Sequence, residues 1–362
     1  MSVVSEPVSI SRVTRDGQVE RLGQWLHDER VLEFDRPGFP FLGPGRHQLE
    51  GELPWIFWDM CPSGYLGRRL MRQRPEVRLP ENPRDWMAKD ILYALTHFGS
   101  ELAGNLLVGD ESVRQFFEFQ SSQTDLAQAL QEALGEAATS GSPSSLGGER
   151  PKLLVGTQGG GVIMKFAPPP ETPQGQRWSD LLRIEALCSR TLYPLSAGSL
   201  ADRLLGRTVL HVKRFDRLPN RARVSVGTLY FLAMERWGEM AISGPEVLTR
   251  LHAEGAIDSA SAEKCGLVHA FSAAIGNNDA HLGNYALLFD DAGAARLAPI
   301  YDVLPMVFAP RNDELPDQWI SPRATPIDPA IAPWVDALVR AVEAEPEISQ
   351  GFKDLWRRYV GA

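Results

Sequence analysis

The sequence predicts an α+β protein of two lobes, with β-strands concentrated in the first part of the chain and α-helices in the second. Its 362 residues exceed the roughly 250–300 that one hydrophobic core usually serves, so two lobes are expected. Alternating apolar segments recur as far as residues 207–217, whereas helical patterns dominate from Gly227 onward. A hydrophobic content of 43% is typical of a folded globular protein.

The first part opens with strand patterns, and short helices follow. The expected elements are strands at 8–13 and 19–34 and helices at 85–98 and 110–119. A hairpin turn signal, Asp16-Gly17, separates the first two strands. Thr124 can cap a further short helix, which we expect to end at Gly135 because glycine commonly terminates helices.

Two small-residue segments lie in the middle of the chain. Residues 138–148 are small and polar, and they suit either a linker or a mobile loop that covers phosphates. Two apolar strands, 152–155 and 162–166, follow at once, and the glycine-rich segment 156–161 joins them. Glycines can cradle a phosphate, but a hairpin turn is the commoner use of such a cluster. We therefore predict a β-hairpin there.

The second part is predicted to be helical around one hairpin. The expected elements are a helix at 178–192, a strand at 207–217, helices at 228–237, 245–253 and 259–275, a hairpin of strands 285–289 and 296–300, and helices at 335–342 and 352–359. The strand at 207–217 becomes strongly polar toward its end, as a connection between two lobes would.

Charge and cysteine content exclude several functional classes. The net charge is −9, from 37 basic and 46 acidic residues, and no long basic run is present, so we expect no direct nucleic-acid binding. The three cysteines are widely spaced without a metal-ligand pattern, which indicates a reducing compartment. No signal peptide and no run of about 18 apolar residues is present. We expect a soluble, cytoplasmic protein that does not span a membrane.

The most informative segment places Asp279 and Asn284 five residues apart, with Asp302 following a predicted hairpin. Phosphoryl transfer to a hydroxyl needs a carboxylate facing the acceptor proton and hard oxygen ligands for magnesium. The hairpin would return Asp302 to the neighbourhood of Asn284. A lone loop aspartate is more often a turn former, but the three residues together favour such a site. Their spacing matches the kinase loop H-R-D-x-x-x-x-N, although Asn277-Asn278 replaces His-Arg.

His281 lies inside this loop, two residues after Asp279. It could bind a metal, contact a phosphate or order the loop by donating a hydrogen bond. No second histidine is nearby, so a zinc site is not expected.

Lys165 ends an apolar strand similar to the V-A-I-K strand, whose lysine steadies the α- and β-phosphates of a nucleotide. Alone, such a lysine is more often a surface residue, but Glu185, on a helix twenty residues later, is an expected ion-pair partner. Lys213, Phe215 and Asp216 lie in the predicted connection between the lobes. Backbone groups there could bind adenine, and Asp216 could bind a ribose hydroxyl.

Together these motifs resemble those of the HipA-type serine/threonine kinases. The similar segments are the catalytic loop 277–284, the metal-binding segment 297–302, the S-x-x-G-x-x-P-K loop at 145–152 and the E-R-F-D-R hinge at 212–217. Residues 59–70 are similar to the YjjJ, or HipH, branch. Two departures are Arg150, in place of the usual Gln before Pro-Lys, and Lys213, in place of the hinge Glu.

The resemblance implies a two-lobed protein-kinase-like fold that uses ATP and Mg²⁺ to phosphorylate a protein Ser or Thr. The implied parts are a HipA N-terminal-like subdomain at 1–135, an ATP-binding core at 136–212 and a helical lobe at 213–362. The implied roles are catalytic base for Asp279, metal ligand for Asn284 and Asp302, phosphate binding for Lys165, and a place beside the phosphates for His281. The implied nucleotide-binding residues also include Gly147, Gly148, Lys152, Glu185, Lys213, Phe215 and Asp216.

The family's loop serine, whose autophosphorylation silences the enzyme, matches Ser145, with the adjacent Ser144 as an alternative. The family also implies a DNA-binding antitoxin partner of the HipB type. Two other functions stay open from the residues alone. One is a small-molecule phosphotransferase that uses the same site, and the other is a catalytically silent member that serves as an interaction module.

Overall fold

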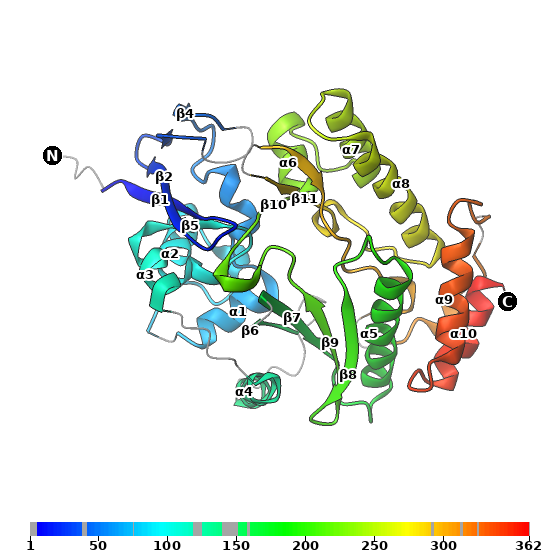
Figure 1. Ribbon diagram of the computed structural model, residues 1–362. Helices are drawn as coiled ribbons and strands as arrows, with labels where there is room; N and C mark the ends of the chain where they lie inside the picture. Colours follow the sequence, from blue (N-terminus) through cyan, green and yellow to red (C-terminus); the bar gives the residue numbers. More distant parts are fainter. Residues whose placement is uncertain are drawn as a thin grey trace.

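The computed structural model contains two antiparallel β-sheets, a small third sheet and ten α-helices within the part of the chain that it describes (Figure 1). That part comprises residues 6–37, 42–74, 76–118, 125–139, 151–157, 160–290, 293–311, 314–323 and 326–361. None of the helices found there has the length and apolar character that a membrane span requires.

The N-terminal part is built on a five-stranded antiparallel sheet with the strand order β4-β3-β2-β1-β5. Its strands are β1 (Val8–Val13), β2 (Val19–Leu26), β3 (Val31–Phe34), β4 (Gly45–Gln48) and β5 (Leu106–Val108). Its helices are the 3-10 helix η1 (Trp55–Met60) and the α-helices α1 (Gly64–Arg72), α2 (Ala88–Phe98) and α3 (Gly109–Glu118). The first hairpin and the last two helices agree with the predictions.

A four-stranded antiparallel sheet, ordered β6-β7-β9-β8, follows in the chain. Its strands are β6 (Lys152–Thr157), β7 (Gly160–Phe166), β8 (Ser199–Leu204) and β9 (Arg207–Lys213). Strands β6 and β7 pair as far as Thr157 and Gly160, which agrees with the predicted β-hairpin. One face of this sheet packs on α4 (Leu126–Thr139), and α5 (Pro173–Thr191) covers the other.

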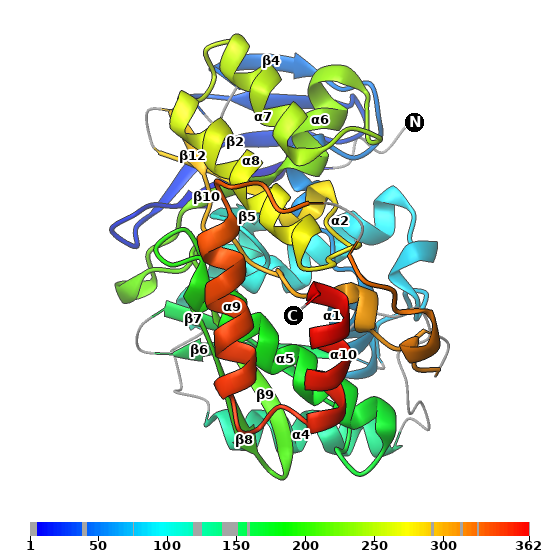
Figure 2. The same ribbon diagram turned by 90° about the vertical axis from the view of Figure 1, so that its right-hand side faces the viewer.

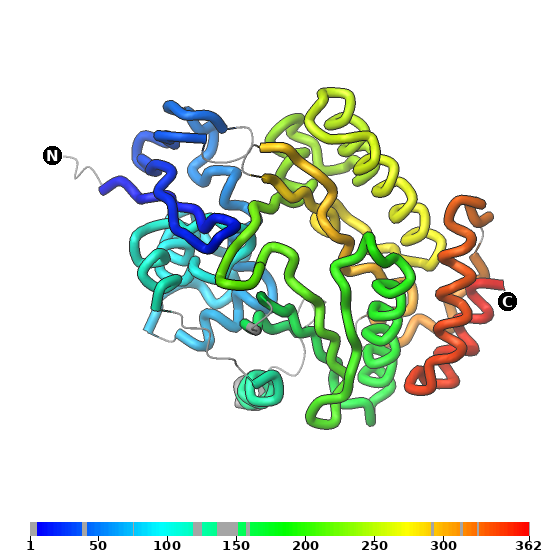
Figure 3. Tube along the Cα trace, in the orientation of Figure 1, coloured from blue at the N-terminus to red at the C-terminus, as the bar shows by residue number. Residues whose placement is uncertain are grey.

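The C-terminal part is mostly helical around a three-stranded sheet, ordered β10-β11-β12. Its strands are β10 (Ser225–Thr228), β11 (Ala286–Phe289) and β12 (Ala295–Leu297). Its helices are α6 (Leu229–Trp237), α7 (Gly244–Ala253), α8 (Ser259–Ala274), α9 (Ala332–Ala344) and α10 (Gln350–Val360). The last two lie beside α5 (Figure 2), and α10 ends on the opposite side of the molecule from β1 (Figure 3).

A continuous hydrophobic core connects the N-terminal and C-terminal parts. Trp25 and Phe57 from the first part and Phe231 and Trp356 from the last belong to the same cluster of buried side chains. At their contact, Trp55 stacks on Phe231 with ring centroids 5.3 Å apart. The N-terminal part therefore packs as an integral layer of the protein, because its buried side chains belong to the same core as those of the C-terminal part.

Several elements differ from the predictions: β4, β5, β8, β10 and α1 were not expected, and α4 extends beyond its expected end. Strand β8 was not expected, because it is an edge strand whose Leu200 is exposed and so lacks a fully apolar face. A two-residue turn, Leu205-Gly206, joins β8 to β9 with positive φ at both positions, and Leu-Gly is not a pair that signals such a turn. Helix α4 continues past Gly135, because burial of its apolar face on the sheet outweighs the cost of about 1 kcal/mol of a helical glycine.

Candidate phosphoryl-transfer site

Lys165 joins two carboxylates from separate elements. Its Nζ lies 2.7 Å from Glu185 Oε1 and 2.5 Å from Asp302 Oδ1. The lysine comes from β7, the glutamate from α5 and the aspartate from the loop after β12. The predicted ion pair between Lys165 and Glu185 is confirmed, and Asp302 is a second partner. The Glu185 side chain is only 4% exposed, whereas that of Asp302 is 44% exposed, so the cluster opens to solvent at the aspartate.

The pleat of the sheet directs Lys165 toward α5. Alternate residues of a strand point to opposite faces, and Met164 and Phe166 belong to the cluster that packs on α4. Lys165 therefore lies on the face that α5 covers. Residues 177–188 of this helix are all buried, and a glutamate in such surroundings needs a cationic partner. Lys165 supplies that partner.

Burial and charge together set the protonation of this cluster. Burial raises the pKa of Glu185 to about 7, against the opposing effect of Lys165. Burial alone would lower the pKa of Lys165, but Asp302 and Glu185 hold it above its usual range. Burial would raise the pKa of Asp302, but Lys165 outweighs burial and the pKa is lowered. The lysine and Asp302 therefore stay charged at neutral pH, whereas Glu185 is readily protonated.

A second lysine faces the same site. Lys152 on β6 is the direct cross-strand partner of Lys165 on β7, and such partners share one face of a sheet. Its charge also acts on Glu185 and Asp302. Like charges directly opposite one another weaken strand pairing. Two lysines in this position therefore favour an anionic ligand.

The loop after α8 presents Asp279 to solvent. The backbone of this residue is held by three hydrogen bonds: its N–H donates to Asn277 Oδ1 (3.1 Å), and its carbonyl accepts from His281 N (3.0 Å) and Asn284 Nδ2 (3.2 Å). No hydrogen bond to its carboxylate occurs among the described residues. Asp279 is thus an exposed acid on a fixed backbone, with Asn284 folded back toward it.

His281 orders the same loop. It precedes the 3-10 helix η5 (Leu282–Asn284), and its Nδ1 accepts a hydrogen bond from Gly283 N at 3.1 Å. Of the three roles left open for His281, the structure shows a loop-ordering contact, made through an accepting nitrogen and not through a donor. A position beside phosphates stays a prediction.

The hairpin of β11 and β12 returns Asp302 to this loop, as predicted. Tyr301 Oη donates a hydrogen bond to the Gly283 carbonyl at 2.8 Å. Asp302 itself has a φ of 60°, a left-handed conformation that aspartate tolerates better than most residues. Such uncommon backbone conformations concentrate at functional sites.

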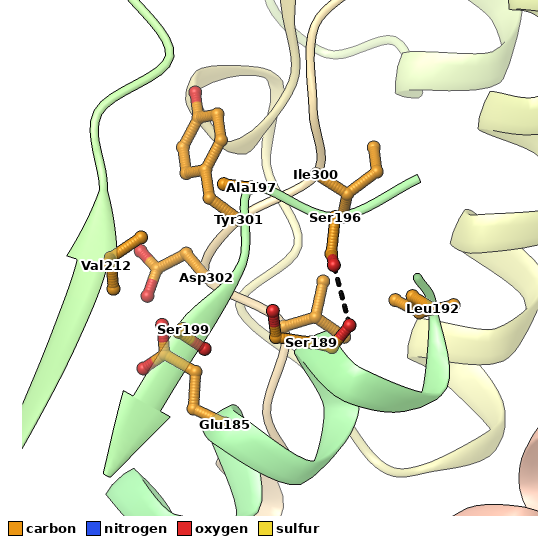
Figure 4. A pocket seen from close by; sticks show the side chains of 11 residues that line it. Glu185, Ser189, Leu192, Ser196, Ala197, Ser199, Val212, Ile300, Tyr301 and Asp302 are labelled. Atoms are coloured by element: carbon orange, nitrogen blue, oxygen red, sulfur yellow. Dashed lines mark hydrogen bonds between the residues drawn. The ribbon is translucent and has the colours of Figure 1, made fainter. Parts of the chain in front are cut away.

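A small cavity lies beside Glu185 and Asp302 (Figure 4). Glu185, Ser199 and Asp302 are among the residues that line it, and its volume is about 10 Å³, close to the minimum that one water molecule requires. Glu185 Oε2 and Ser199 Oγ are both buried and have no hydrogen-bond partner among the described residues. A single water at this position could bind these two oxygens.

Asp216 does not face the site. It is 6% exposed, and its carboxylate accepts hydrogen bonds from Arg214 Nη2 at 2.7 Å, Arg217 Nη1 at 2.9 Å and Gly104 N at 3.0 Å. Because this carboxylate is engaged inside the protein, it is not available to a ribose hydroxyl, in contrast to the prediction. Instead it anchors the connection between the lobes to the N-terminal part.

The other two predicted residues of this connection differ from one another. Lys213 is exposed and its N–H donates to Gly198 O at 3.1 Å, while the next N–H, of Arg214, donates to Gly161 O at 2.8 Å. These two backbone donors are therefore not free for adenine. Phe215 packs near the site, with its ring centroid 5.7 Å from that of Tyr301.

The predicted phosphate-covering loop lies outside the described residues. Its members are Ser144, Ser145, Gly147 and Gly148, which all fall between residues 139 and 151. Their roles stay predictions.

The donor atoms fit a magnesium ion that is shared with a ligand. Asn284 directs its Nδ2 to a carbonyl and Asp302 gives Oδ1 to Lys165, which leaves Asn284 Oδ1 and Asp302 Oδ2 without hydrogen bonds from the described residues. Mg²⁺ prefers such oxygens and usually takes one or two protein ligands together with phosphates and water. The described residues contain no group of three or more His, Cys, Asp or Glu side chains that could enclose a metal on their own.

Sequence reasoning missed Tyr301, Ser199 and the buried arginines Arg214 and Arg217. The arginines had a recognisable signal, because an alternation of charged residues directly after an apolar strand is unusual for an exposed loop. Tyr301 and Ser199 had none, since their contacts depend on segments that are distant in the chain.

Comparison with known proteins gives two family matches. The YjjJ-like toxin middle domain matches residues 4–117, and the HipA-like C-terminal domain matches residues 144–355. Toxin YjjJ of Escherichia coli (strain K12) is 30% identical over 332 residues, which cover 86% of this chain and 74% of that protein.

Among solved structures, HipA shows the same architecture. HipA in the Shewanella oneidensis MR-1 toxin–antitoxin complex of HipA, HipB and operator DNA has a TM-score of 0.55 at 14% identity, with 97% of both chains covered. The Helicobacter pylori proinflammatory kinase CtkA has a TM-score of 0.39 at 14% identity, covering 57% of this chain and 88% of that one. The HipA similarity bears out the predicted two-lobed α+β fold. With a C-terminal domain match over more than half its length and a curated relative at 30% identity, the chain belongs to the HipA-like family, among the members that carry the YjjJ-like middle domain.

Proposed function

We propose that this protein is a kinase that transfers the γ-phosphoryl group of ATP to a Ser or Thr hydroxyl of another protein. One observation carries the proposal: Lys165 is held between Glu185 and Asp302. Protein kinases need a strand lysine paired with a helix glutamate, and an aspartate for the metal close by. The opposed Lys152 adds a second positive charge where phosphates would bind.

Each residue has a distinct task in this reaction. Lys165 and Lys152 hold phosphate oxygens by charge. Asp279 accepts the proton of the acceptor hydroxyl while the hydroxyl oxygen bonds to the γ-phosphorus and the bond from that phosphorus to the β-phosphate oxygen breaks, releasing ADP. Asn284 and Asp302 would hold Mg²⁺, which supplies charge neutralisation of the phosphates when bound. The exposed carboxylate of Asp279 supports its assignment, because an acceptor can approach it.

Labelled ATP tests the proposal. In the presence of Mg²⁺ we expect transfer of the γ-phosphoryl group to protein, and Asp279→Asn should lower the rate about 10²–10⁴-fold, the usual share of a general base. An unchanged rate in that variant would remove Asp279 from the role of base. Transfer only to sugars or small alcohols would instead identify a small-molecule phosphotransferase, and absence of nucleotide binding would identify an interaction module.

We also propose that the activity is toxic and is restrained by a partner. The curated relative is named a toxin, and the solved HipA structure contains HipB and operator DNA. A separate DNA-binding protein agrees with the net charge of −9, since this chain has no long basic run. Expression of the wild type should arrest growth, whereas Asp279→Asn should not. Equal toxicity of the two would separate growth arrest from phosphoryl transfer.

Autophosphorylation of the loop is the third part of the proposal. Phosphate on Ser145 adds about −1.5 to −2 charge near the expected ATP phosphates, so repulsion should weaken nucleotide binding. Mass spectrometry after incubation with ATP would distinguish Ser145 from Ser144 as the modified residue. Ser145→Asp should bind ATP more weakly than the parent, and equal affinity would contradict this regulation.

A further inference from the structure

Asp59 of the N-terminal part binds the C-terminal part directly. Its Oδ2 accepts a hydrogen bond from Thr228 N and its Oδ1 accepts one from Thr228 Oγ1, each at 2.7 Å. Burial raises the pKa of Asp59, and both Thr228 bonds act against that effect. Both carboxylate oxygens of Asp59 therefore accept hydrogen bonds from Thr228, which lies 169 positions later in the chain.

Thr228 lies directly behind the catalytic loop. It is the last residue of β10 and pairs with Ala286, the first residue of β11. The next N–H, of Leu229, donates to the Tyr285 carbonyl at 2.8 Å. Tyr285 follows Asn284 in the sequence. The pairing of β10 with β11 therefore connects Thr228 to the end of the loop that begins at Asp279.

Packing restricts the same contact from the other side. Asp59 belongs to η1, and Trp55 from that helix stacks on Phe231 of α6, the helix that Thr228 precedes. Tyr301 lies close enough to Asp59 and Asp302 that both raise its pKa, although burial has the larger effect. Asp59 is therefore near the metal-binding side of the site as well as the strand behind the loop.

We propose that Asp59 is a positioning residue: through Thr228 and the β10–β11 pairing it fixes the loop that carries Asp279 and Asn284. It touches no reacting atom. The N-terminal part is then a component of the phosphoryl-transfer site, because the Asp59 contact holds the strand from which the end of the loop continues. The inference rests on the proposed kinase function for its kinetic consequences, but the structural coupling stands independently of it.

Graded substitutions test the coupling. Asp59→Ala leaves the Thr228 N–H and hydroxyl without their acceptors, whereas Asp59→Asn can still accept from the N–H and donate to the hydroxyl. We expect kcat to fall about 10- to 100-fold for alanine, the effect of a displacement of about 1 Å, and less for asparagine. The KM for ATP should change less than kcat, because the phosphate-binding Lys165 lies on a different sheet, although Asn284 belongs to the displaced loop. Asp90→Ala is the matched control, since Asp90 caps α2 inside the N-terminal part through Met87 N.

Hydrogen exchange gives a readout that does not require activity. In Asp59→Ala, peptides covering residues 276–288 should exchange faster, while peptides from β7 and β9 should not change. A general loss of protection, equal in Asp59→Ala and Asp90→Ala, would reduce Asp59 to a stabilising contact and overturn the proposal. If the wild type transfers no phosphate but the local exchange effect is present, the kinase function fails while the coupling is retained. If Asp59→Ala does not fold, Thr228→Val removes only the hydroxyl bond and should show the same local effect, smaller in size; no local effect there would also overturn the proposal.

Discussion

The Tyr301 hydroxyl donates a hydrogen bond to the Gly283 carbonyl at 2.8 Å. This single contact closes the base of the β11–β12 hairpin, because Gly283 precedes Asn284 and Tyr301 precedes Asp302. The two proposed metal ligands are thus the immediate neighbours of the two bonded residues. Their separation is fixed by a side chain that takes no part in the chemistry.

Tyr301→Phe should weaken the positioning of Asn284 and Asp302 while leaving both residues in place. The variant removes one partly buried hydrogen bond, and such a bond typically contributes about 0.5–1.5 kcal/mol to the free energy of unfolding. We expect a correspondingly lower melting temperature together with weaker Mg²⁺-dependent ATP binding, and unchanged ATP binding in EDTA. Calorimetric titration in both conditions checks this. A loss of stability with no change in Mg²⁺ dependence would mean that the hydroxyl does not position the ligands.

Asp302→Ala should abolish the Mg²⁺ dependence of ATP binding. Lys165 keeps Glu185 as a partner in this variant, so the protein should remain folded. The binding constant for ATP, measured with and without Mg²⁺, should become the same. Asp336→Ala changes an exposed aspartate on α9 and serves as the control. Retained Mg²⁺ dependence in Asp302→Ala would place the metal elsewhere.

Glu185→Gln should change how stability varies with pH. The pKa of Glu185 is raised to about 7 in the folded protein from an ordinary value of 4.5, mainly by burial. The folded state therefore binds a proton that the unfolded state has lost between these values, and the wild type loses stability as pH rises through this window. The glutamine variant has no such proton. Its melting temperature relative to the wild type should rise from pH 4.5 to 7 and then level off, and a constant difference would contradict the raised pKa.

The rate of phosphoryl transfer by the wild type should also depend on the ionisation of Glu185, but it should rise with pH where stability falls. Ionised Glu185 holds Lys165 by charge, so activity should increase as pH rises through about 7. The activity of Glu185→Gln should not show this rise near pH 7, because glutamine does not ionise. Glu171→Gln, at an exposed position before α5, should keep the wild-type profile.

Asp216→Asn should lower stability without altering recognition of ribose. Removing one partner of a buried ion pair typically costs about 3–5 kcal/mol, because Arg214 and Arg217 would keep their charges without the carboxylate. The ratio of ATP to dATP affinities should stay at the wild-type value, since Asp216 does not face the site. A ratio that falls toward one would restore the ribose contact predicted from the sequence. Asp202→Asn, at an exposed site on β8, is the control for both measurements.

Much of this architecture could be predicted from local sequence signals. The hairpin at 285–300 and the helices around it have regular apolar periodicity, and the Asp279-to-Asn284 spacing depends only on neighbours in the chain. The ion pair of Lys165 and Glu185 was also accessible, because a charged residue in an apolar strand or helix needs a partner. Each of these features depends either on residues that are close in the sequence or on the need of a buried charge for an opposite charge.

The remaining features depend on tertiary packing. Helix α4 continues through Gly135 because of a sheet that lies beyond the next loop. Asp216 has the composition of a ligand-binding residue, and only the folded chain shows that two arginines and the Gly104 N–H surround it. The Asp59–Thr228 contact spans 169 residues, a separation at which no local pattern carries information.

The opposed lysines give this protein an internal tension with a thermodynamic consequence. Lys152 and Lys165 repel one another across β6 and β7, and any polyanion that lies between them relieves that repulsion. The repulsion that lowers the stability of the sheet is therefore the same electrostatic free energy that favours binding of an anion. A bound nucleotide would therefore stabilise the pairing of β6 and β7, the two strands that carry these lysines.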